Sequence, residues 1–320
     1  MNLTNLSVIK EILSRHEFNF AKKLGQNFLI NPSVCPKMAD SALLKNSDGK
    51  PDTIKNNENN IGDNKPEPDK TNALEIGPGI GVLTQELAKR ADKVVSVEID
   101  KKLIPVLNET LSEYNNITVL NADFLTLNLE EIILKYFGKT SIENGEKVAI
   151  CANLPYYITS PIIMHILESS ANKKNMISNI TCLVQKEVAE RFIKQDSAIA
   201  LAIHYYGDVK KLFGVKKGSF IPSPKVDSAV IQIDIKNKFK LNQTEEENLF
   251  RIIKAAYMQR RKTLSNSLGK LYDKELSNQI LEEKFGCVTI RPEELDIEDF
   301  IEVSKIYEKE NCGYIRRSEL

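Results

Sequence analysis

The sequence has no net charge, no paired-cysteine motif and no apolar run long enough to cross a membrane. Its 44 Lys and Arg residues balance 44 Asp and Glu residues, so overall charge gives no hint of a nucleic-acid partner. The five cysteines are far apart and form no C-x-x-C pair, which argues against a zinc site or a disulfide framework. The first 15 residues lack the apolar core of a signal peptide. We therefore expect a reduced, cytoplasmic protein without a metal site and without membrane association.

Short apolar strands and helical patterns alternate through the middle of the chain. The expected strands lie near residues 73–76, 93–98, 117–120, 148–151 and 180–185. Strands separated by helices predict an α/β fold with a doubly wound, mainly parallel sheet. Two later strand candidates, residues 209–215 and 226–233, have no clear helix between them and could form an antiparallel edge.

The chain divides into a larger and a smaller part. The pattern becomes wholly helical from about residue 244, which predicts an α/β domain over residues 1–240 and a smaller all-helical domain over residues 241–320. Residues 46–72 contain almost no apolar side chains and cannot offset the entropy cost of ordering. We expect them to be a flexible surface insertion.

A glycine-rich turn follows the first expected strand and predicts a nucleoside cofactor. Glu75 precedes the glycines Gly77, Gly79 and Gly81, and Glu98 ends the next strand 21 positions after Gly77. Glycines allow a ligand to approach the backbone closely, and an acidic residue in that position accepts hydrogen bonds from a ribose diol. The alternative interpretation is that the glycines form a plain tight loop that binds no ligand.

The spacing and the charges favour S-adenosylmethionine over NAD. NAD enzymes prefer G-x-G-x-x-G, whereas Gly81 comes one residue early. Glu75 suits the cationic amino and sulfonium groups of S-adenosylmethionine. After the third strand, Asp123 can accept from an adenine amino group with Phe124 packed nearby, although Asp123 could instead be a helix N-cap.

A polar and aromatic segment ends the fourth expected strand. Asn153, Leu154, Pro155 and Tyr156 follow an apolar run at the edge where open α/β sheets bind ligands. Asn offers an acceptor and a donor, Pro155 stiffens the turn, and Tyr156 offers a flat face for stacking. An acceptor beside an aromatic ring is a plausible seat for an extruded base, and an ordinary strand-to-loop turn is the alternative.

In this order, the motifs resemble the small-subunit rRNA adenine N6,N6-dimethyltransferases of the KsgA type. The resemblance covers nearly the whole chain except residues 46–72. It is carried by segments 23–29, 75–81, 97–100, 121–124, 153–158, 184–189, 220–230 and 260–264. It implies dimethylation of two adjacent adenosines of small-subunit (16S) rRNA during ribosome biogenesis. It also implies that Asn27 and Leu29 line the S-adenosylmethionine site together with Gly77, Glu98, Asp123 and Asn153.

The expected mechanism activates an exocyclic nitrogen without a general base. The Asn153 side-chain oxygen and the Leu154 carbonyl would accept hydrogen bonds from the adenine N6 group and orient it toward the methyl group. Tyr156 would stack on the adenine, and Phe220 would close its other face. The three histidines, His16, His165 and His204, lie outside the motifs and are expected to be structural or solvated.

Local clusters of basic residues suggest where RNA binds. We expect Lys22, Lys23, Lys216, Lys217, Arg260, Arg261 and Lys262 to contact phosphates. The alternative interpretation is that these basic residues belong to a solvated helix face and bind no RNA. The expected partners are small-subunit rRNA and the immature small ribosomal subunit. We expect the protein to be a monomer.

Three other functions compete with this interpretation. A large-subunit (23S) rRNA adenine methyltransferase of the macrolide-resistance type has nearly the same catalytic residues. A non-catalytic ribosome assembly factor would keep the fold but not require intact Asn153 to Tyr156. A nicotinamide dehydrogenase fails on glycine spacing.

Overall fold

The computed structural model describes residues 1–18, 25–43, 72–259, 262–269 and 271–318, with side chains up to Lys309. The expected insertion at residues 46–72 lies outside the described residues except for Asn72. That residue is buried and begins a strand, so the expected insertion is one residue too long at this end.

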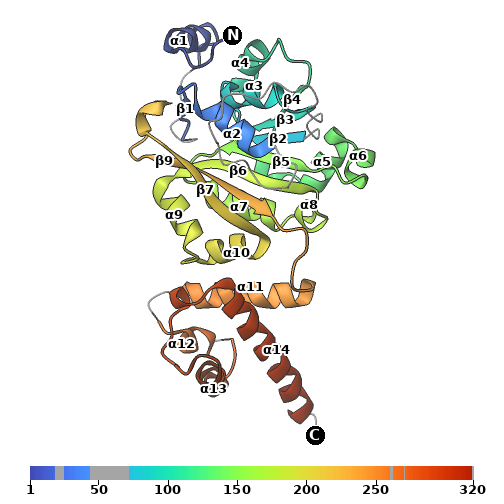
Figure 1. Cartoon of the computed structure of the whole chain (residues 1–320), viewed down its shortest axis with the longest axis vertical. Helices are drawn as coiled ribbons and strands as arrows, with labels where there is room; N and C mark the ends of the chain where they lie inside the picture. The colour runs from blue at the N-terminus through green and yellow to red at the C-terminus, as the bar shows by residue number, and fades with distance from the viewer. Residues whose placement is uncertain (19–24, 44–71, 260–261, 270, 319–320) are drawn as a thin grey trace, which may run out of the picture. The chain divides into compact units, whose positions relative to one another are not determined.

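Nine strands are described (Figure 1). They are β1 (Phe28–Leu29), β2 (Asn72–Ile76), β3 (Val94–Glu98), β4 (Ile117–Asn121), β5 (Val148–Asn153), β6 (Ile177–Gln185), β7 (Gly207–Val215), β8 (Phe220–Ile221) and β9 (Ser228–Ile235).

Seven of these strands form one sheet in the order β4-β3-β2-β5-β6-β9-β7. The pairs from β4 to β6 are parallel, and β9 is antiparallel to β6. The expected mainly parallel sheet with an antiparallel edge is confirmed. The apolar runs of β2, β3 and β5 are buried almost throughout, as expected for strands covered on both faces.

The described helices connect strands of the sheet or, after β9, follow one another in the chain. They are α1 (Leu6–Arg15), α2 (Val34–Leu43), α3 (Val82–Ala88), α4 (Leu103–Thr110), α5 (Leu129–Phe137), α6 (Lys139–Glu143), α7 (Thr159–Leu167), α8 (Ser170–Lys173), α9 (Lys186–Ile193), α10 (Ala198–Tyr206), α11 (Gln243–Met258), α12 (Leu264–Leu268), α13 (Lys274–Phe285) and α14 (Ile297–Ser318), with short 3-10 turns η2 (Phe124–Thr126), η3 (Lys217–Ser219) and η4 (Pro292–Glu294). Among the described helices, none is both long and apolar enough to cross a membrane.

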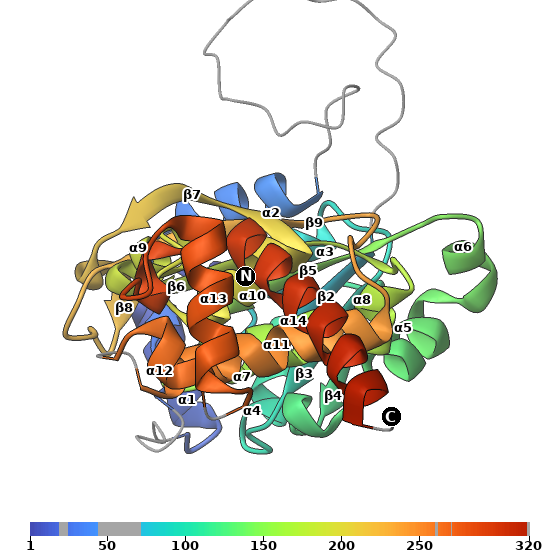
Figure 2. The same ribbon diagram turned by 90° about the horizontal axis from the view of Figure 1, so that it is seen from below.

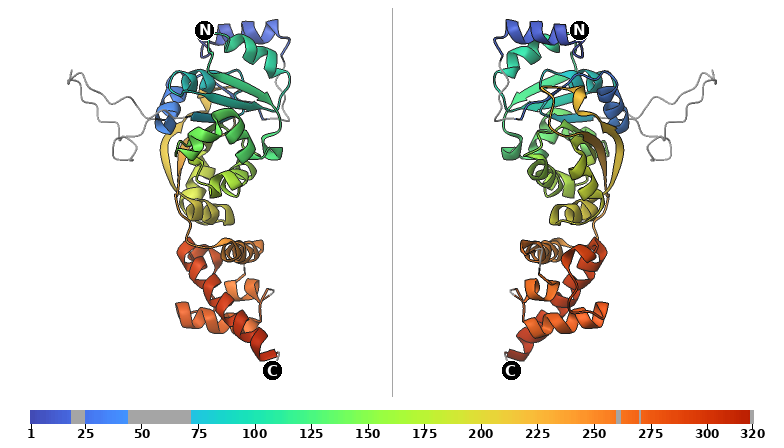
Figure 3. Two further views of the ribbon diagram at one scale, coloured as in Figure 1. Left: turned by 90° about the vertical axis from the view of Figure 1, so that its right-hand side faces the viewer. Right: turned by 90° about the vertical axis from the view of Figure 1, so that its left-hand side faces the viewer.

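The strand order creates a crevice at one edge of the sheet. The chain runs from β2 outward to β3 and β4, then returns to β5 on the other side of β2. Right-handed crossovers therefore place α3 and α4 on one face and α5 and α7 on the opposite face (Figure 3). At this reversal, the loops that follow β2 and β5 lead to opposite faces of the sheet and leave space between them, which is where open α/β sheets bind ligands.

The described residues form two compact units. The first contains Met1–Ala189 and Lys210–Ile235, and the second contains Glu190–Val209 and the chain from Lys236 on. The single boundary expected at residue 240 assigns α10 to the α/β domain. In the structure, α10 belongs instead to the same compact unit as the C-terminal helices. Within the second unit, the Tyr206 hydroxyl of α10 donates to a Glu246 carboxylate oxygen of α11 at 2.9 Å.

Helices α11 to α14 also belong to the second unit (Figure 2). The wholly helical pattern expected from residue 244 is confirmed for the described residues. Helix α10 was not anticipated because its sequence is apolar at almost every position and shows no 3.6-residue period.

Candidate active site

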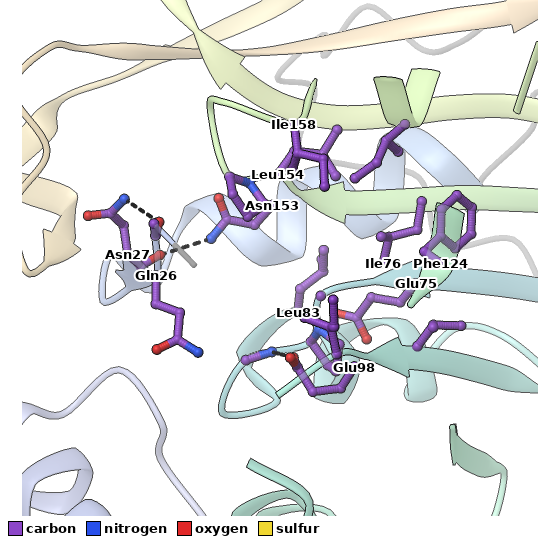
Figure 4. Close-up of a pocket in the computed structure, with 18 of the residues that line it drawn as sticks. Gln26, Asn27, Glu75, Ile76, Leu83, Glu98, Phe124, Asn153, Leu154 and Ile158 are labelled. Carbon is purple, nitrogen blue, oxygen red and sulfur yellow. Dashed lines mark hydrogen bonds between the residues drawn. The ribbon is translucent and has the colours of Figure 1, made fainter. Parts of the chain in front are cut away.

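A cavity opens at the carboxyl ends of β2, β3 and β5, and the segment around β1 forms part of its wall (Figure 4). It lies within the first compact unit. The cavity brings together all but one of the residues predicted for the cofactor and the reaction. Those lining it are Asn27, Leu29, Glu75, Gly77, Gly79, Glu98, Asp123, Phe124, Asn153, Leu154, Pro155 and Tyr156.

The glycine turn between β2 and α3 needs glycine for two reasons. Gly77, Gly79 and Gly81 have φ angles of 69°, 61° and 93°, in the left-handed region. A Cβ atom on Gly79 would also lie 3.2 Å from Cε1 of Phe28, across the cavity wall. The Gly79 amide donates to a Glu98 carboxylate oxygen at 3.2 Å, so the turn is tied to the end of β3.

We expect Gly79→Ala to weaken cofactor binding by more than its effect on folding explains. Gly145→Ala is the matched control, because Gly145 has a φ of 93° but a Cβ atom added there would have no neighbour within 4 Å. Both substitutions should cost about 1 kcal/mol of backbone strain. Thermal unfolding and calorimetric titration with S-adenosylmethionine separate the effects. Equal cofactor affinities in the two variants would show that the turn does not approach the ligand.

Glu98 is held in place by the backbone on both sides. One carboxylate oxygen accepts from the Gly79 amide and the other accepts from the Asp100 amide at 2.8 Å. The side chain is buried, and burial raises its pKa to about 6 although both backbone hydrogen bonds lower it. A carboxylate fixed in this way at the cavity wall is preorganised to accept from a ribose diol.

Glu75 carries a second buried carboxyl group beneath the same turn. It accepts a hydrogen bond from the Ser96 hydroxyl at 2.7 Å, and burial raises its pKa to about 7. A buried carboxylate without a cation is costly, so the arrangement favours a positively charged ligand in the cavity.

We expect Glu75→Gln to stabilise the unliganded protein at pH 8 but not at pH 4.5. The folded protein retains the Glu75 proton up to about pH 7, whereas the unfolded chain releases it near the ordinary carboxyl pKa. The free energy of unfolding therefore falls as pH rises through this window, and the loss is complete above the folded pKa. Chemical denaturation from pH 4.5 to pH 8 measures it, with the exposed Glu283→Gln as the control.

The turn after β4 combines a cap with a candidate adenine contact. One Asp123 carboxylate oxygen accepts from the Leu125 amide at 3.0 Å, so Asp123 does cap the short turn η2. The other oxygen is left for a ligand at the cavity wall. Phe124 is buried against the edge of His165, whose Nε2 lies 3.0 Å from the Leu127 carbonyl oxygen. His165 is thus structural, as expected.

The amide of Asn153 is oriented by the N-terminal segment. Its Nδ2 donates to the Asn27 carbonyl oxygen at 3.2 Å, and Asn27 Nδ2 donates to the Gly25 carbonyl oxygen at 2.9 Å (Figure 4). With Nδ2 occupied, Oδ1 is the Asn153 atom available to accept a hydrogen bond from a ligand.

Two residues outside the predicted set, Gln26 and Ser228, line the cavity or contact a residue that lines it. Gln26 lines it and donates through Nε2 to Asp100 at 2.8 Å, which ties the N-terminal segment to the loop after β3. Tyr156 lines the cavity with its hydroxyl 2.7 Å from that of Ser228 on β9. Neither Gln26 nor Ser228 has a spacing that marks it in the sequence, because their partners lie 74 and 72 positions away.

Phe220 is the predicted catalytic residue that does not line the cavity. It lies on β8, opposite Leu29 of β1, and is only 3% exposed. Its side chain belongs to the apolar core that also contains Leu29, Val34 and Met38. In this structure Phe220 therefore supports the wall formed by Leu29.

The predicted RNA-binding lysines differ in their surroundings. Lys216 is exposed but forms an ion pair with Asp227 at 3.0 Å, whereas Lys217 and Lys262 are exposed at the ends of short turns. Lys22, Lys23, Arg260 and Arg261 lie outside the described residues.

The cavity thus combines a glycine turn, a buried carboxylate held by two backbone amides, a turn that carries Asp123 and Phe124, and a second buried acid that favours a cationic ligand. These features define a Rossmann-like, S-adenosylmethionine-dependent methyltransferase. The family model for ribosomal RNA adenine dimethylase matches residues 17–309, and the chain belongs to this family.

Relatives agree with this family over nearly the whole chain. The ribosomal RNA small subunit methyltransferase A of Bacillus pumilus (strain SAFR-032) is 37% identical over 310 residues, or 94% of this chain and 95% of the relative. The protein of that name from Bacillus mycoides (strain KBAB4) is 38% identical over 305 residues, or 92% of this chain and 94% of the relative.

Solved structures show the same fold. The dimethyladenosine transferase from Plasmodium falciparum has a TM-score of 0.65 at 23% identity and covers 89% of this chain and 98% of its own. The 23S rRNA methyltransferase ErmE has a TM-score of 0.60 at 26% identity and covers 87% of this chain and 100% of its own.

Proposed function

We propose that this protein transfers methyl groups from S-adenosylmethionine to N6 of two adjacent adenosines in small-subunit rRNA. The product is N6,N6-dimethyladenosine, formed while the small subunit is assembled. The main support is the orientation of Asn153, whose Nδ2 is bonded to the Asn27 carbonyl so that Oδ1 can accept from an exocyclic amine.

The reaction is a displacement at the sulfonium methyl, which the cofactor supplies. The lone pair of adenine N6 is delocalised into the purine ring, so the nitrogen is a weak nucleophile. Hydrogen bonds from N6 to Asn153 Oδ1 and to the Leu154 carbonyl favour a more pyramidal nitrogen and align it with the methyl group. Tyr156 stacks on the adenine. Asp123, Glu98 and Glu75 hold the cofactor.

A general base is unnecessary in this mechanism. The methylated nitrogen carries a positive charge after displacement and loses its proton readily. The three histidines have other partners, since His16 pairs with Glu109, His165 with the Leu127 carbonyl and His204 with the Phe192 carbonyl. For the second transfer, N6 carries a single hydrogen, so one of the two acceptors suffices.

The relatives favour the small-subunit substrate over the large-subunit one. Two proteins named as small-subunit methyltransferases are 37% and 38% identical to this chain, whereas the solved 23S enzyme is 26% identical. Because the acceptor Asn153, the glycine turn and Glu98 are all in place, a purely non-catalytic assembly factor is the weaker alternative.

The RNA contacts form a further part of this proposal. Lys217 in the first unit and Lys262 in the second are exposed and can meet phosphates. The proposal also includes Lys22, Lys23, Arg260 and Arg261, which lie outside the described residues. Lys216 contributes less because Asp227 partly neutralises it. We propose that a monomer acts in the cytoplasm on the immature small subunit.

The decisive experiment compares two substrates. The protein is incubated with S-adenosylmethionine and either immature small subunits or protein-free 23S rRNA, and dimethyladenosine is mapped by mass spectrometry. We expect adjacent dimethyladenosines in the small-subunit rRNA. If only the 23S rRNA is modified, the protein is a methyltransferase of the large-subunit type. If neither RNA is modified, the result favours a non-catalytic assembly factor.

A further inference from the structure

The segment 222–228, Pro-Ser-Pro-Lys-Val-Asp-Ser, has no role in the mechanism above although it carries part of the family resemblance. It follows β8, ends on Ser228, the first residue of β9, and is fixed at several points. The Asp227 carboxylate accepts from the Lys217 amide at 3.0 Å and from Lys216 Nζ at 3.0 Å. The Ser223 hydroxyl donates to the Lys217 carbonyl oxygen at 2.9 Å.

The end of the segment is also attached to the main sheet. The Asp227 carbonyl accepts from the Lys186 amide at 3.1 Å, at the start of α9. The next residue, Ser228, is paired with Gln185 in the antiparallel ladder between β9 and β6. Ser228 is therefore anchored by backbone contacts on a strand of the central sheet.

The side chain of Ser228 is buried and contacts Tyr156, a residue that lines the cavity. It is only 1% exposed, and its hydroxyl lies 2.7 Å from that of Tyr156. The Tyr156 ring is thus attached at both ends, through its own backbone after β5 and through its hydroxyl to β9. An aromatic ring with a fixed hydroxyl loses freedom in both side-chain torsions.

Burial has a second consequence for this pair. It raises the pKa of the Tyr156 phenol, so the hydroxyl stays neutral at physiological pH and can donate to or accept from Ser228. No other function is needed for the phenol, because stacking requires only the ring.

We propose that Ser228 is a positioning residue that sets the plane of the Tyr156 ring through the hydroxyl–hydroxyl bond and so orients the target adenine for methyl transfer. This inference rests on the proposed function, in which Tyr156 stacks on the adenine. It assigns the segment 222–227 the task of holding Ser228 in register beside the Tyr156 hydroxyl.

The test is a double-mutant cycle with Ser228→Ala, Tyr156→Phe and both together. We expect each single substitution to lower the single-turnover rate of methyl transfer about tenfold, the size expected for a lost orienting hydrogen bond. The double variant should be no slower than Tyr156→Phe, since both changes remove the same bond. Ser228→Thr keeps the hydroxyl and should methylate at the wild-type rate. The affinity for S-adenosylmethionine should be unchanged in all of these variants.

A matched control separates positioning from loss of stability. Ser277→Ala removes a hydroxyl that is equally buried but bonds to the Asp273 carbonyl within its own helix. It should alter thermal unfolding without changing the methyl-transfer rate. The proposal is overturned if Ser228→Ala leaves the rate unchanged, or if it slows the Tyr156→Phe enzyme as much as the wild type.

A second readout needs no RNA. In protein labelled with 3-fluorotyrosine, the resonance of Tyr156 is the one missing from Tyr156→Phe, and we expect Ser228→Ala to shift it while Ser228→Thr does not. An unshifted resonance overturns the proposal. If the wild type methylates neither substrate, the proposed function fails, and this spectrum still decides whether Ser228 holds the ring.

Discussion

Asn153→Ala is expected to lower the rate of methyl transfer about 100- to 1000-fold, the range seen when a group that stabilises a transition state is removed. The substitution removes Oδ1, which we propose accepts a hydrogen bond from the exocyclic nitrogen and orients it. It also removes the Nδ2 hydrogen bond to the Asn27 carbonyl, so the wall formed by the N-terminal segment is loosened. Cofactor binding should therefore survive only in part.

The measurement is single-turnover methylation of immature small subunits at saturating S-adenosylmethionine, with cofactor affinity determined separately by calorimetry. Asn144→Ala is the control, because Asn144 is exposed at the end of α6 and does not line the cavity. A variant whose cofactor affinity falls as far as its rate would assign Asn153 to the cofactor alone. An unchanged rate would remove it from the mechanism.

Glu98→Ala should weaken S-adenosylmethionine binding about 100-fold or more, because hydrogen bonds to a charged group contribute roughly 1.5–3 kcal/mol each. The carboxylate is already oriented by the Gly79 and Asp100 amides, so little ordering is needed when the ribose binds. Glu98→Gln keeps one acceptor oxygen and should lie between Ala and the wild type.

The affinity of each Glu98 variant is measured by calorimetry at pH 8, above the pKa of about 6. There the wild-type carboxyl is ionised. Wild-type affinity should decline as pH falls through 6, and the Gln variant should show a weaker dependence in that range. Glu283→Gln again serves as the exposed control. Equal affinities for Glu98→Ala and the wild type would show that the ribose binds elsewhere.

Local sequence was sufficient for features that depend on neighbouring residues. The strands β2, β3 and β5 were predictable because each is a short apolar run followed by a turn. The positive φ angles at Gly77, Gly79 and Gly81 required glycine, and the position of Glu98 followed from the length of one strand–helix–strand unit. The adjacent residues Asp123 and Phe124 were recognisable for the same reason.

Other features depend on residues distant in sequence. Helix α10 has no amphipathic period, so its packing against α11, and with it the composition of the second unit, could not be read from its sequence. Phe220 looked like a second stacking ring, but β8 pairs with β1 and turns it into the core behind Leu29. A sequence pattern cannot distinguish a buried aromatic side chain that lines a cavity from one that supports its wall.

The sequence by itself determined the class of chemistry: a cationic nucleoside cofactor bound at a glycine turn, and an amide, a proline and an aromatic ring placed to receive a base. Only the tertiary structure decided how these groups are oriented. The Asn153 amide is turned by the Asn27 carbonyl, and the Tyr156 hydroxyl is held by Ser228. Residue types and short spacings fix which atoms are available for chemistry, whereas hydrogen bonds across 126 and 72 positions of chain fix where those atoms point.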